Sequence, residues 1–157
     1  MKTYIINPDN NKPVSIEDWS KDKDPKRAQL LAIETEDGHL LVMSKSFLPG
    51  RHDFEEAQQL CKNFAPKGFD GITFRAPTRK ETIDMYDARF QGLNEAIKLT
   101  GGNYACNPDG NWYWTCERDT DPRCCAYSAW YSNGTYGYLG GSGMYNSGQA
   151  VPVALLK

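Results

Sequence analysis

The sequence predicts an α+β fold in which strands and helices occupy separate parts of the chain. Three observations indicate this class. Two apolar runs flank an Asp-Gly turn in residues 29–45, two helix-start signals lie in residues 53–100, and no helical period remains after residue 102. At 157 residues the chain has the size of one domain, with N-terminal strands (1–45), helices (53–100) and a sheet with long loops (103–157).

The N-terminal third predicts strands joined by a polar connection. "TYIIN" (3–7) has the pattern of a short strand, and residues 13–28 are polar and charged, as expected for a connecting segment on the surface. The apolar runs near 29–35 and 39–45 predict a hairpin, because the Gly of Asp37-Gly38 adopts the positive φ that a tight turn requires.

Two helices are predicted next. Asp53 and Glu56 resemble a capping box at the start of "DFEEAQQLCKNFA" (53–65), and Thr78 and Glu81 form a second one. The first helix has an apolar face at helical spacing that includes Cys61, which we therefore expect to be a small core residue. The second helix spans about 79–99 with a break near Gly92. Its predicted apolar stripe consists of Ile83, Tyr86, Phe90, Leu93 and Ile97.

The last third predicts an antiparallel sheet. "NWYWTC" (111–116) and "AYSAWYS" (126–132) are strand candidates, and Asn133-Gly134 offers a hairpin turn. "AVPVALL" (150–156) is a closing strand expected to pair with an N-terminal strand, and its Pro152 indicates an edge or bulge position. Strand alternation implies that Tyr113 faces outward if Trp112 and Trp114 face the core. It likewise implies that Tyr131 faces outward if Trp130 faces inward.

Bulk properties exclude several classes of partner. The net charge of −2 gives no reason to expect nucleic acid, and no apolar run approaches the ~20 residues of a membrane helix. The N-terminus has no apolar segment typical of a secretory signal, so we expect a cytoplasmic protein, with a phage virion as the alternative. Five cysteines without a signal indicate reduced thiols.

Catalytic and metal-binding patterns are weak in this sequence. Only His39 and His52 could serve as a catalytic base, and turn and helix-cap roles explain both better. The acidic turn at Glu117, Asp119 and Asp121 has weak cation-site spacing. The adjacent pair Cys124-Cys125 could bind a soft metal, but structural thiols are favoured. The sequence therefore predicts no enzyme activity, no cofactor and no metal.

The most distinctive segment is rich in tyrosine and small polar residues. Tyr, Ser, Asn and Gly make up 17 of the 24 residues from 126 to 149. Antibody paratopes use the same residue types, because Tyr supplies rigid contact area and Ser, Gly and Asn supply adaptable hydrogen bonds. The alternative is that the small residues only form turns and that the Tyr side chains pack on the sheet. The predicted binding residues are Tyr131, Asn133, Tyr136, Tyr138, Ser142, Tyr145 and Asn146.

The order of these features resembles a known family. "DFEEAQQLC", "ITFRAPTRKETIDMY", "YWTC-E", a Tyr/Asn/Gly hairpin and "AVPVALL" are similar to motifs of the bacterial C-type-lectin-like family typified by the C-terminal domain of Lcl adhesins. The resemblance covers about residues 40–157. The chain departs from the family pattern at Ala76, where the family has Leu, and at Cys116, where it has Ser. The matching residues are Ala57, Cys61, Arg75, Pro77, Thr78, Glu81, Tyr113, Trp114, Thr115, Glu117, Val151, Pro152 and Val153.

The resemblance implies a C-type-lectin-like fold, with two helices packed on antiparallel sheets and long C-terminal loops that form a ligand face. It implies recognition or adhesion, with a protein or carbohydrate as ligand, and leaves oligomerisation open. Related folds include the variable proteins of diversity-generating retroelements, whose adenine-directed changes produce residue types abundant in 123–148. Formylglycine-generating enzymes are also related, so an oxidase at Cys124 and Cys125 is one alternative function. A structural or phage tail-like assembly protein is the other.

Overall fold

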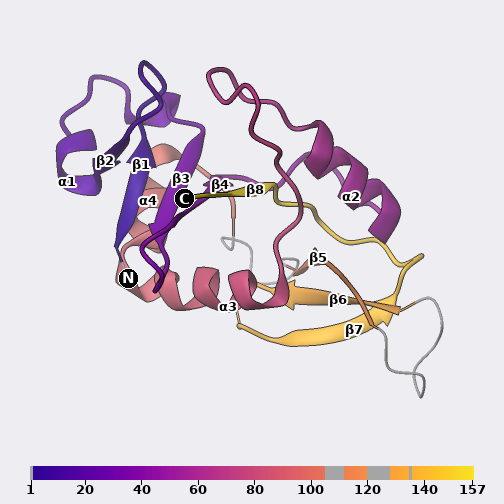
Figure 1. The fold of residues 1–157 in the computed structure, drawn as a ribbon. Helices are drawn as coiled ribbons and strands as arrows, with labels where there is room; N and C mark the ends of the chain where they lie inside the picture. Colours follow the sequence, from indigo (N-terminus) through magenta and orange to yellow (C-terminus); the bar gives the residue numbers. More distant parts are fainter. Residues whose placement is uncertain (1, 105–111, 120–127, 135) are drawn as a thin grey trace.

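The computed structural model describes residues 2–104, 112–119, 128–134 and 136–157. Two antiparallel sheets are present, a larger one in the order β2-β1-β3-β4-β8 and a smaller one in the order β5-β6-β7. Figure 1 shows β6 and β7 at the far end of the molecule from α1 and β2. The strands are β1 (Thr3–Ile6), β2 (Pro13–Ser15), β3 (Leu30–Glu34), β4 (Leu40–Ser44), β5 (Trp112–Arg118), β6 (Ser128–Asn133), β7 (Leu139–Gly143) and β8 (Val153–Leu156). The helices are α1 (Ile16–Trp19), α2 (Phe54–Asn63), α3 (Arg79–Ala88) and α4 (Leu93–Thr100), with the short 3-10 turns η1 (Pro25–Arg27) and η2 (Arg89–Gln91).

The β3–β4 hairpin forms the centre of the larger sheet, as predicted. Gly38 has a φ of +79° at its turn, and the register runs from Leu30 opposite Ser44 to Glu34 opposite Leu40. Alternate residues of β3 and β4 are buried on both faces of the sheet. Continuous apolar runs, and not strict alternation, therefore mark these two strands.

The closing strand β8 pairs antiparallel with β4, which confirms the prediction that the C-terminal strand joins the N-terminal ones. On its other side Val153 is bridged to Arg75 through two backbone hydrogen bonds of 2.8 and 2.9 Å. Pro152, which has no N–H to donate, stands just before this edge strand.

Both helices start at the predicted caps, but the predicted capping box at α2 is only half formed, because the Glu56 carboxylate lies 3.3 Å from the His52 ring. The Asp53 carboxylate accepts a hydrogen bond of 2.9 Å from the Glu56 N–H and caps α2. The capping box at α3 is complete, with Glu81 N donating to Thr78 Oγ1 and Thr78 N donating to the Glu81 carboxylate. A left-handed Gly92, with a φ of +112°, ends η2 and starts α4.

The predicted apolar stripe of the second helix is wrong in its first half. Ile83 is 50% exposed and Phe90 is 71% exposed, whereas Met85 and Ala88 are fully buried. The capping box and an Arg75–Glu81 ion pair fix the rotation of the first turn, and that rotation turns Ile83 outward. Leu93 and Ile97, beyond the Gly92 break, are buried as predicted.

Residues 13–28 are not the plain surface connection that their polarity predicted. They form β2, α1 and η1, and they bury Trp19, whose indole Nε1 donates to the Pro25 carbonyl. Arg27 organises the segment by bonding the carboxylates of Asp9 and Asp22 and by lying 4.8 Å from the Trp19 ring centroid. Alternation and periodicity do not detect such a side-chain network.

Alternation also failed in β5. Tyr113 and Trp114 are adjacent, yet both are fully buried, while Trp112 is only half-buried. Tyr113 packs with Phe47 and Tyr104 in one hydrophobic core, and Trp114 packs with Phe54 in another. The strand therefore lies between two cores, so neither of its faces is free for an outward Tyr113.

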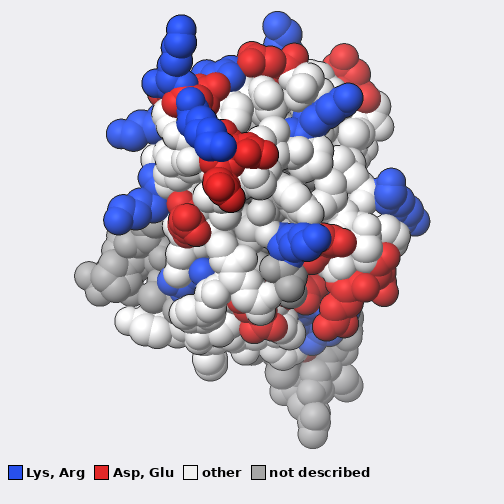
Figure 2. All heavy atoms as spheres, turned by 90° about the vertical axis from the view of Figure 1, so that its left-hand side faces the viewer, with Lys and Arg blue, Asp and Glu red and all other residues white. Residues whose placement is uncertain are grey.

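The charged side chains show no field of a single sign on the face that carries α1 and β2. Figure 2 shows Lys and Arg interspersed with Asp and Glu there. Among the residues described, no helix has both the length and the apolar character that crossing a membrane requires.

Candidate ligand-binding cleft

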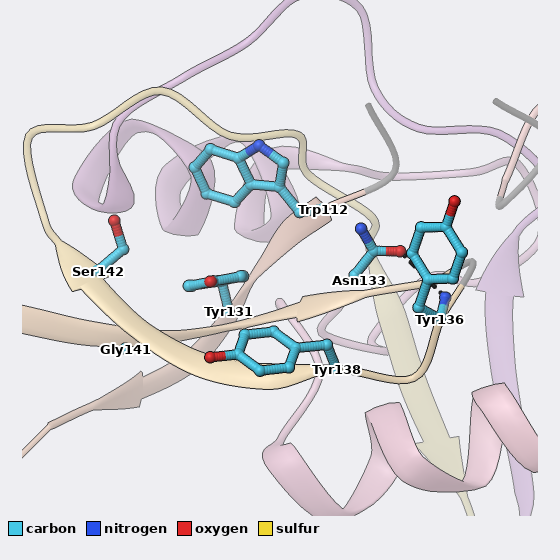
Figure 3. A pocket seen from close by; sticks show the side chains of 7 residues that line it. All are labelled: Trp112, Tyr131, Asn133, Tyr136, Tyr138, Gly141 and Ser142. Atoms are coloured by element: carbon cyan, nitrogen blue, oxygen red, sulfur yellow. Dashed lines mark hydrogen bonds between the residues drawn. The ribbon is translucent and has the colours of Figure 1, made fainter. Parts of the chain in front are cut away.

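An open cleft of about 390 Å³ lies on one face of the smaller sheet. Figure 3 shows the side chains around it, contributed by β5, β6, β7 and the turn between β6 and β7. We call it the aromatic cleft. Its described lining residues are Trp112, Tyr131, Asn133, Tyr136, Tyr138, Gly141 and Ser142.

Three rings form a continuous series along the cleft. The Tyr131 centroid is 5.1 Å from that of Trp112, at an interplanar angle of 66°. On its other side it is 6.0 Å from that of Tyr138, at 47°. Tyr131 therefore lies between the other two rings, and the three planes are inclined toward one another, as Figure 3 shows. All three rings belong to the lining of the cleft.

Two glycines make room for these rings. A Cβ atom at Gly140 would lie 2.7 Å from Cε1 of Tyr138, and a Cβ at Gly148 would lie 2.6 Å from Cζ3 of Trp112. Any other residue at either position would push the ring away. Gly140 and Gly148 thus contribute to the shape of the cleft.

The polar groups of the cleft are held in place by hydrogen bonds. Asn133 Oδ1 accepts from the backbone N–H of Tyr136 at 3.1 Å, which fixes the turn that carries the Tyr136 ring. The Ser142 hydroxyl accepts from Nδ2 of Asn146 at 2.9 Å. The positive φ of this hairpin, +69°, is at Gly137, so the turn extends past the predicted Asn133-Gly134 pair.

The described lining of the cleft carries no charged residue. Burial, together with the neighbouring Tyr138, raises the pKa of Tyr131, so its phenol stays neutral at physiological pH. The Arg51 guanidinium lies 5.3 Å from the Trp112 ring centroid but is not part of the lining. The cleft therefore presents neutral aromatic rings, one amide and hydroxyl groups.

The structure brings together five of the seven predicted binding residues: Tyr131, Asn133, Tyr136, Tyr138 and Ser142. Tyr136 and Tyr138 are 67% and 59% exposed, whereas Tyr131 and Trp130 are both half-buried, so alternation does not separate these two side chains. Asn146 reaches the cleft only through Ser142.

Tyr145 lies outside the aromatic cleft. It is 78% exposed and borders a separate hollow with Asp53, Glu55 and Arg118. Sequence reasoning did not include Trp112 among the binding residues. Its position at the start of a predicted strand could have indicated this, because side chains at the end of a strand are often less buried than those in its middle, as they are in β5.

His52 and Glu117, two of the residues considered for catalysis or cation binding, contact neighbouring elements of the fold. The His52 ring bonds the Pro49 carbonyl at 2.8 Å and the Glu56 carboxylate at 3.3 Å, beside the α2 cap. The Glu117 carboxylate accepts from the backbone N–H of Arg79 at 2.6 Å and from its Nε at 3.2 Å. In the described ranges no group of three or more His, Cys, Asp or Glu side chains could hold a metal ion.

The described cysteines are protonated thiols. Burial, with a smaller contribution from Cys116, raises the pKa of Cys61 to about 12, and burial also raises the pKa of Cys116. Both are free, and Cys61 is the buried core residue that the helix pattern predicted. Cys106, Asp121, Cys124 and Cys125 lie outside the described residues, so the metal and oxidase alternatives at these positions are untested.

No protein-family model matches this chain, and no curated protein is similar to it. The α+β class and the antiparallel sheets agree with the sequence prediction. The narrower resemblance to the C-type-lectin-like family stays a prediction.

Proposed function

We propose that this chain is a non-catalytic recognition module that binds a protein or carbohydrate ligand through the aromatic cleft. The observation that supports this function best is the exposure of Tyr136 and Tyr138 beside Trp112 and Tyr131. Large aromatic side chains gathered on an exposed surface typically mark an interaction site. Here they surround a hollow in which a ligand would contact several rings at once.

The energetics of tyrosine favour this use. A Tyr side chain has only two χ angles to immobilise, so an exposed Tyr forms a contact at low entropic cost. Truncation of an aromatic anchor at an interface typically costs about 2 kcal/mol or more of binding free energy. Asn133 and Ser142 would add directional hydrogen bonds within the same cleft.

The narrower assignments are proposals as well. The closing strand on β4 and two helices that begin with capped turns support a C-type-lectin-like fold. The exposed Tyr136 and Tyr138, with the half-buried Asn133 and Ser142 on the same hairpin, support a retroelement variable protein. A near-identical DNA repeat that differs from the coding segment only at adenines would establish the latter, and its absence from the flanking DNA would rule it out.

A binding screen tests the proposed function. Wild-type protein is screened against a glycan panel and a protein panel, and each hit is measured again with Tyr136→Ala/Tyr138→Ala. We expect the double variant to lose at least about thirtyfold in affinity, which corresponds to the 2 kcal/mol typical of one anchor. Phe90→Ala is the control, because Phe90 is as exposed but lies on η2, outside the lining of the cleft.

Two results would overturn the proposal. Hits that bind the double variant as well as the wild type would place the ligand elsewhere. Self-association of the wild type that the double variant abolishes, without any hit, would mean that the same face packs against another copy of the chain.

A further inference from the structure

We propose that the outward side of α3 and η2 is a self-association surface, at which two copies of this chain pair antiparallel about a two-fold axis. This inference does not depend on the proposed function, because other residues line the aromatic cleft. We call the surface the α3 face, and its residues are Arg79, Lys80, Ile83, Tyr86, Asp87 and Phe90.

The α3 helix turns large apolar side chains outward, unlike an ordinary surface helix. Such a helix directs its apolar stripe toward the core and its polar residues toward water. The buried side of α3 includes the polar residues Glu81, Thr82 and Asp84, whereas Ile83 and Phe90 are exposed. Exposed apolar side chains that gather on one face of a protein typically mark an interaction surface.

The aromatic rings of the α3 face are held in place by the rest of the chain. The Phe90 ring lies edge-on to the Tyr86 ring, with centroids 5.6 Å apart at an interplanar angle of 82°. The Arg89 guanidinium lies 5.8 Å from the Phe90 centroid and donates to the Gly134 carbonyl, which joins η2 to the end of β6. A Cβ atom at Gly137 would lie 2.8 Å from Cδ1 of Tyr86, so the turn after β6 lies directly against this ring. Rings fixed in this way lose little conformational entropy when a second surface covers them.

The order of the charges favours a second copy of the same chain as the occupant. Lys80 lies one turn before Ile83 and Asp87 lies one turn after it, and both charged side chains are exposed. Lys80 lies 3.4 Å from Asp84 but remains 70% exposed, so its ammonium can contact a further carboxylate. A two-fold axis that crosses α3 near Ile83 makes the two helices antiparallel and brings Lys80 of each copy to Asp87 of the other. The α3 face is therefore complementary to itself.

The same pairing also gives the exposed Phe90 ring a partner. With the axis near Ile83, the Phe90 of each copy would lie toward the start of the other copy's α3, where Arg79 is half-exposed. An Arg guanidinium over an aromatic face is an attractive contact. The α3 face has far fewer residues than the about 20–30 per side of a stable complex, so we expect a weak dimer that forms at high concentration.

Sedimentation velocity over a concentration series tests the self-association. We expect wild-type protein to be mostly monomeric at about 10 µM and to dimerise as its concentration approaches about 500 µM, as mass action requires for a small interface. Ile83→Asp places a charge at the centre of the pairing and should weaken it at least about tenfold. Phe90→Ala, which introduces no charge, should weaken it about fivefold. Ile72→Asp is the control, because it makes the same change at an exposed Ile in the loop between α2 and α3 and should have no effect.

Two charge reversals test the antiparallel arrangement. Lys80→Glu brings a carboxylate to Asp87 of the other copy, and Asp87→Lys brings an ammonium to Lys80, so each variant alone should dimerise at least about fivefold more weakly. In an equimolar mixture of the two variants, the heterodimer has a pair of opposite charges at both positions, so we expect it to form about as tightly as the wild-type dimer. Urea unfolding of each variant confirms that it is folded.

Four results would overturn the inference. These are a wild type that stays monomeric over the whole concentration series, Ile83→Asp and Phe90→Ala variants that dimerise as well as the wild type, an Ile72→Asp control that is weakened as much as Ile83→Asp, and a mixture of the charge variants that associates no better than either alone. The aromatic cleft is tested separately. Tyr136→Ala/Tyr138→Ala should dimerise like the wild type, and Ile83→Asp should keep the wild-type affinity for hits from the binding screen, because Ile83 is not part of the described lining.

Discussion

Trp114→Ala is expected to lower the free energy of unfolding by about 3–5 kcal/mol, the range for a large aromatic removed from a core. Trp114 is fully buried and packs edge-on against Phe54, with ring centroids 5.6 Å apart. Its indole Nε1 also donates to the His52 carbonyl at 3.0 Å, so truncation leaves a cavity and removes one of the two hydrogen bonds that this carbonyl accepts, the other coming from the Gly148 N–H at 2.8 Å. Urea denaturation followed by circular dichroism measures the loss.

Trp112→Ala is the matched control for this experiment. Trp112 lies two residues away on the same strand but is only half-buried and borders the aromatic cleft. Folding buries less apolar surface of Trp112 than of Trp114. The expected loss of unfolding free energy is therefore less than about half of that for Trp114→Ala. Equal losses in the two variants would contradict the assignment of Trp114 to the core and of Trp112 to the cleft.

Glu81→Ala is expected to cost about 2–3 kcal/mol. The Glu81 carboxylate accepts two hydrogen bonds from the Arg75 guanidinium, at 2.6 and 2.9 Å, and one from the Thr78 backbone N–H at 2.8 Å. Arg75 is also bridged to Val153, so this cluster joins the start of α3 to the edge of the larger sheet. Removing one partner of a buried ion pair costs about 3–5 kcal/mol, but the Arg75 side chain is 34% exposed, which lowers the expected loss.

The contribution of Glu81 should depend on pH. Burial alone would raise the pKa of Glu81, but the hydrogen bonds from Arg75 and Thr78 outweigh burial and hold the pKa below its usual 4.5. A carboxylate whose pKa is lower in the folded than in the unfolded protein stabilises the fold fully at a pH above its pKa in the unfolded protein. This stabilisation is lost as the pH falls through its pKa in the folded protein. The difference in unfolding free energy between wild type and Glu81→Gln should therefore shrink as the pH falls below 4.5.

Glu55→Gln is the control for the ion pair. Glu55 bonds Arg118, but both side chains are largely exposed, so we expect a loss below about 1 kcal/mol. A Glu81→Gln difference that stayed constant from neutral pH to pH 3, or a loss no larger than that of Glu55→Gln, would contradict the role given to Glu81.

Local signals in the sequence predicted much of this fold. The Asp37-Gly38 turn, the caps at Asp53 and Thr78, and the break at Gly92 each depend on a few neighbouring residues, and each is present in the structure. The prediction of the closing strand succeeded for a related reason, because "AVPVALL" is apolar enough for a strand buried against the sheet.

The errors involve contacts between distant segments. Alternation assumes one buried face, and it failed at Tyr113 because β5 lies between two cores. Helical periodicity placed the large apolar residues Ile83 and Phe90 on the buried face. The Arg75–Glu81 ion pair instead determines which side of α3 faces the core. Neither fact can be read from the residues next to these positions.

The candidate site was predicted only in part, because it too depends on contacts between distant segments. Composition identified the Tyr-rich hairpin, and five of its chosen residues line one cleft. Tyr145 separates from them because a turn from Gly143 to Asn146, closed by a 3.0 Å backbone hydrogen bond, carries it past the end of β7. Trp112 joins them from β5, which only the pairing of the strands reveals.

The central claim is that the rings of Tyr136 and Tyr138 serve a ligand and not the fold. The most direct test is the free energy of unfolding of Tyr136→Ala/Tyr138→Ala, measured by urea denaturation beside the wild type. Because both side chains are mostly exposed, we expect the two proteins to agree within about 0.5 kcal/mol. A loss of about 2 kcal/mol or more would mean that these rings are part of the core, and it would contradict the proposed binding face.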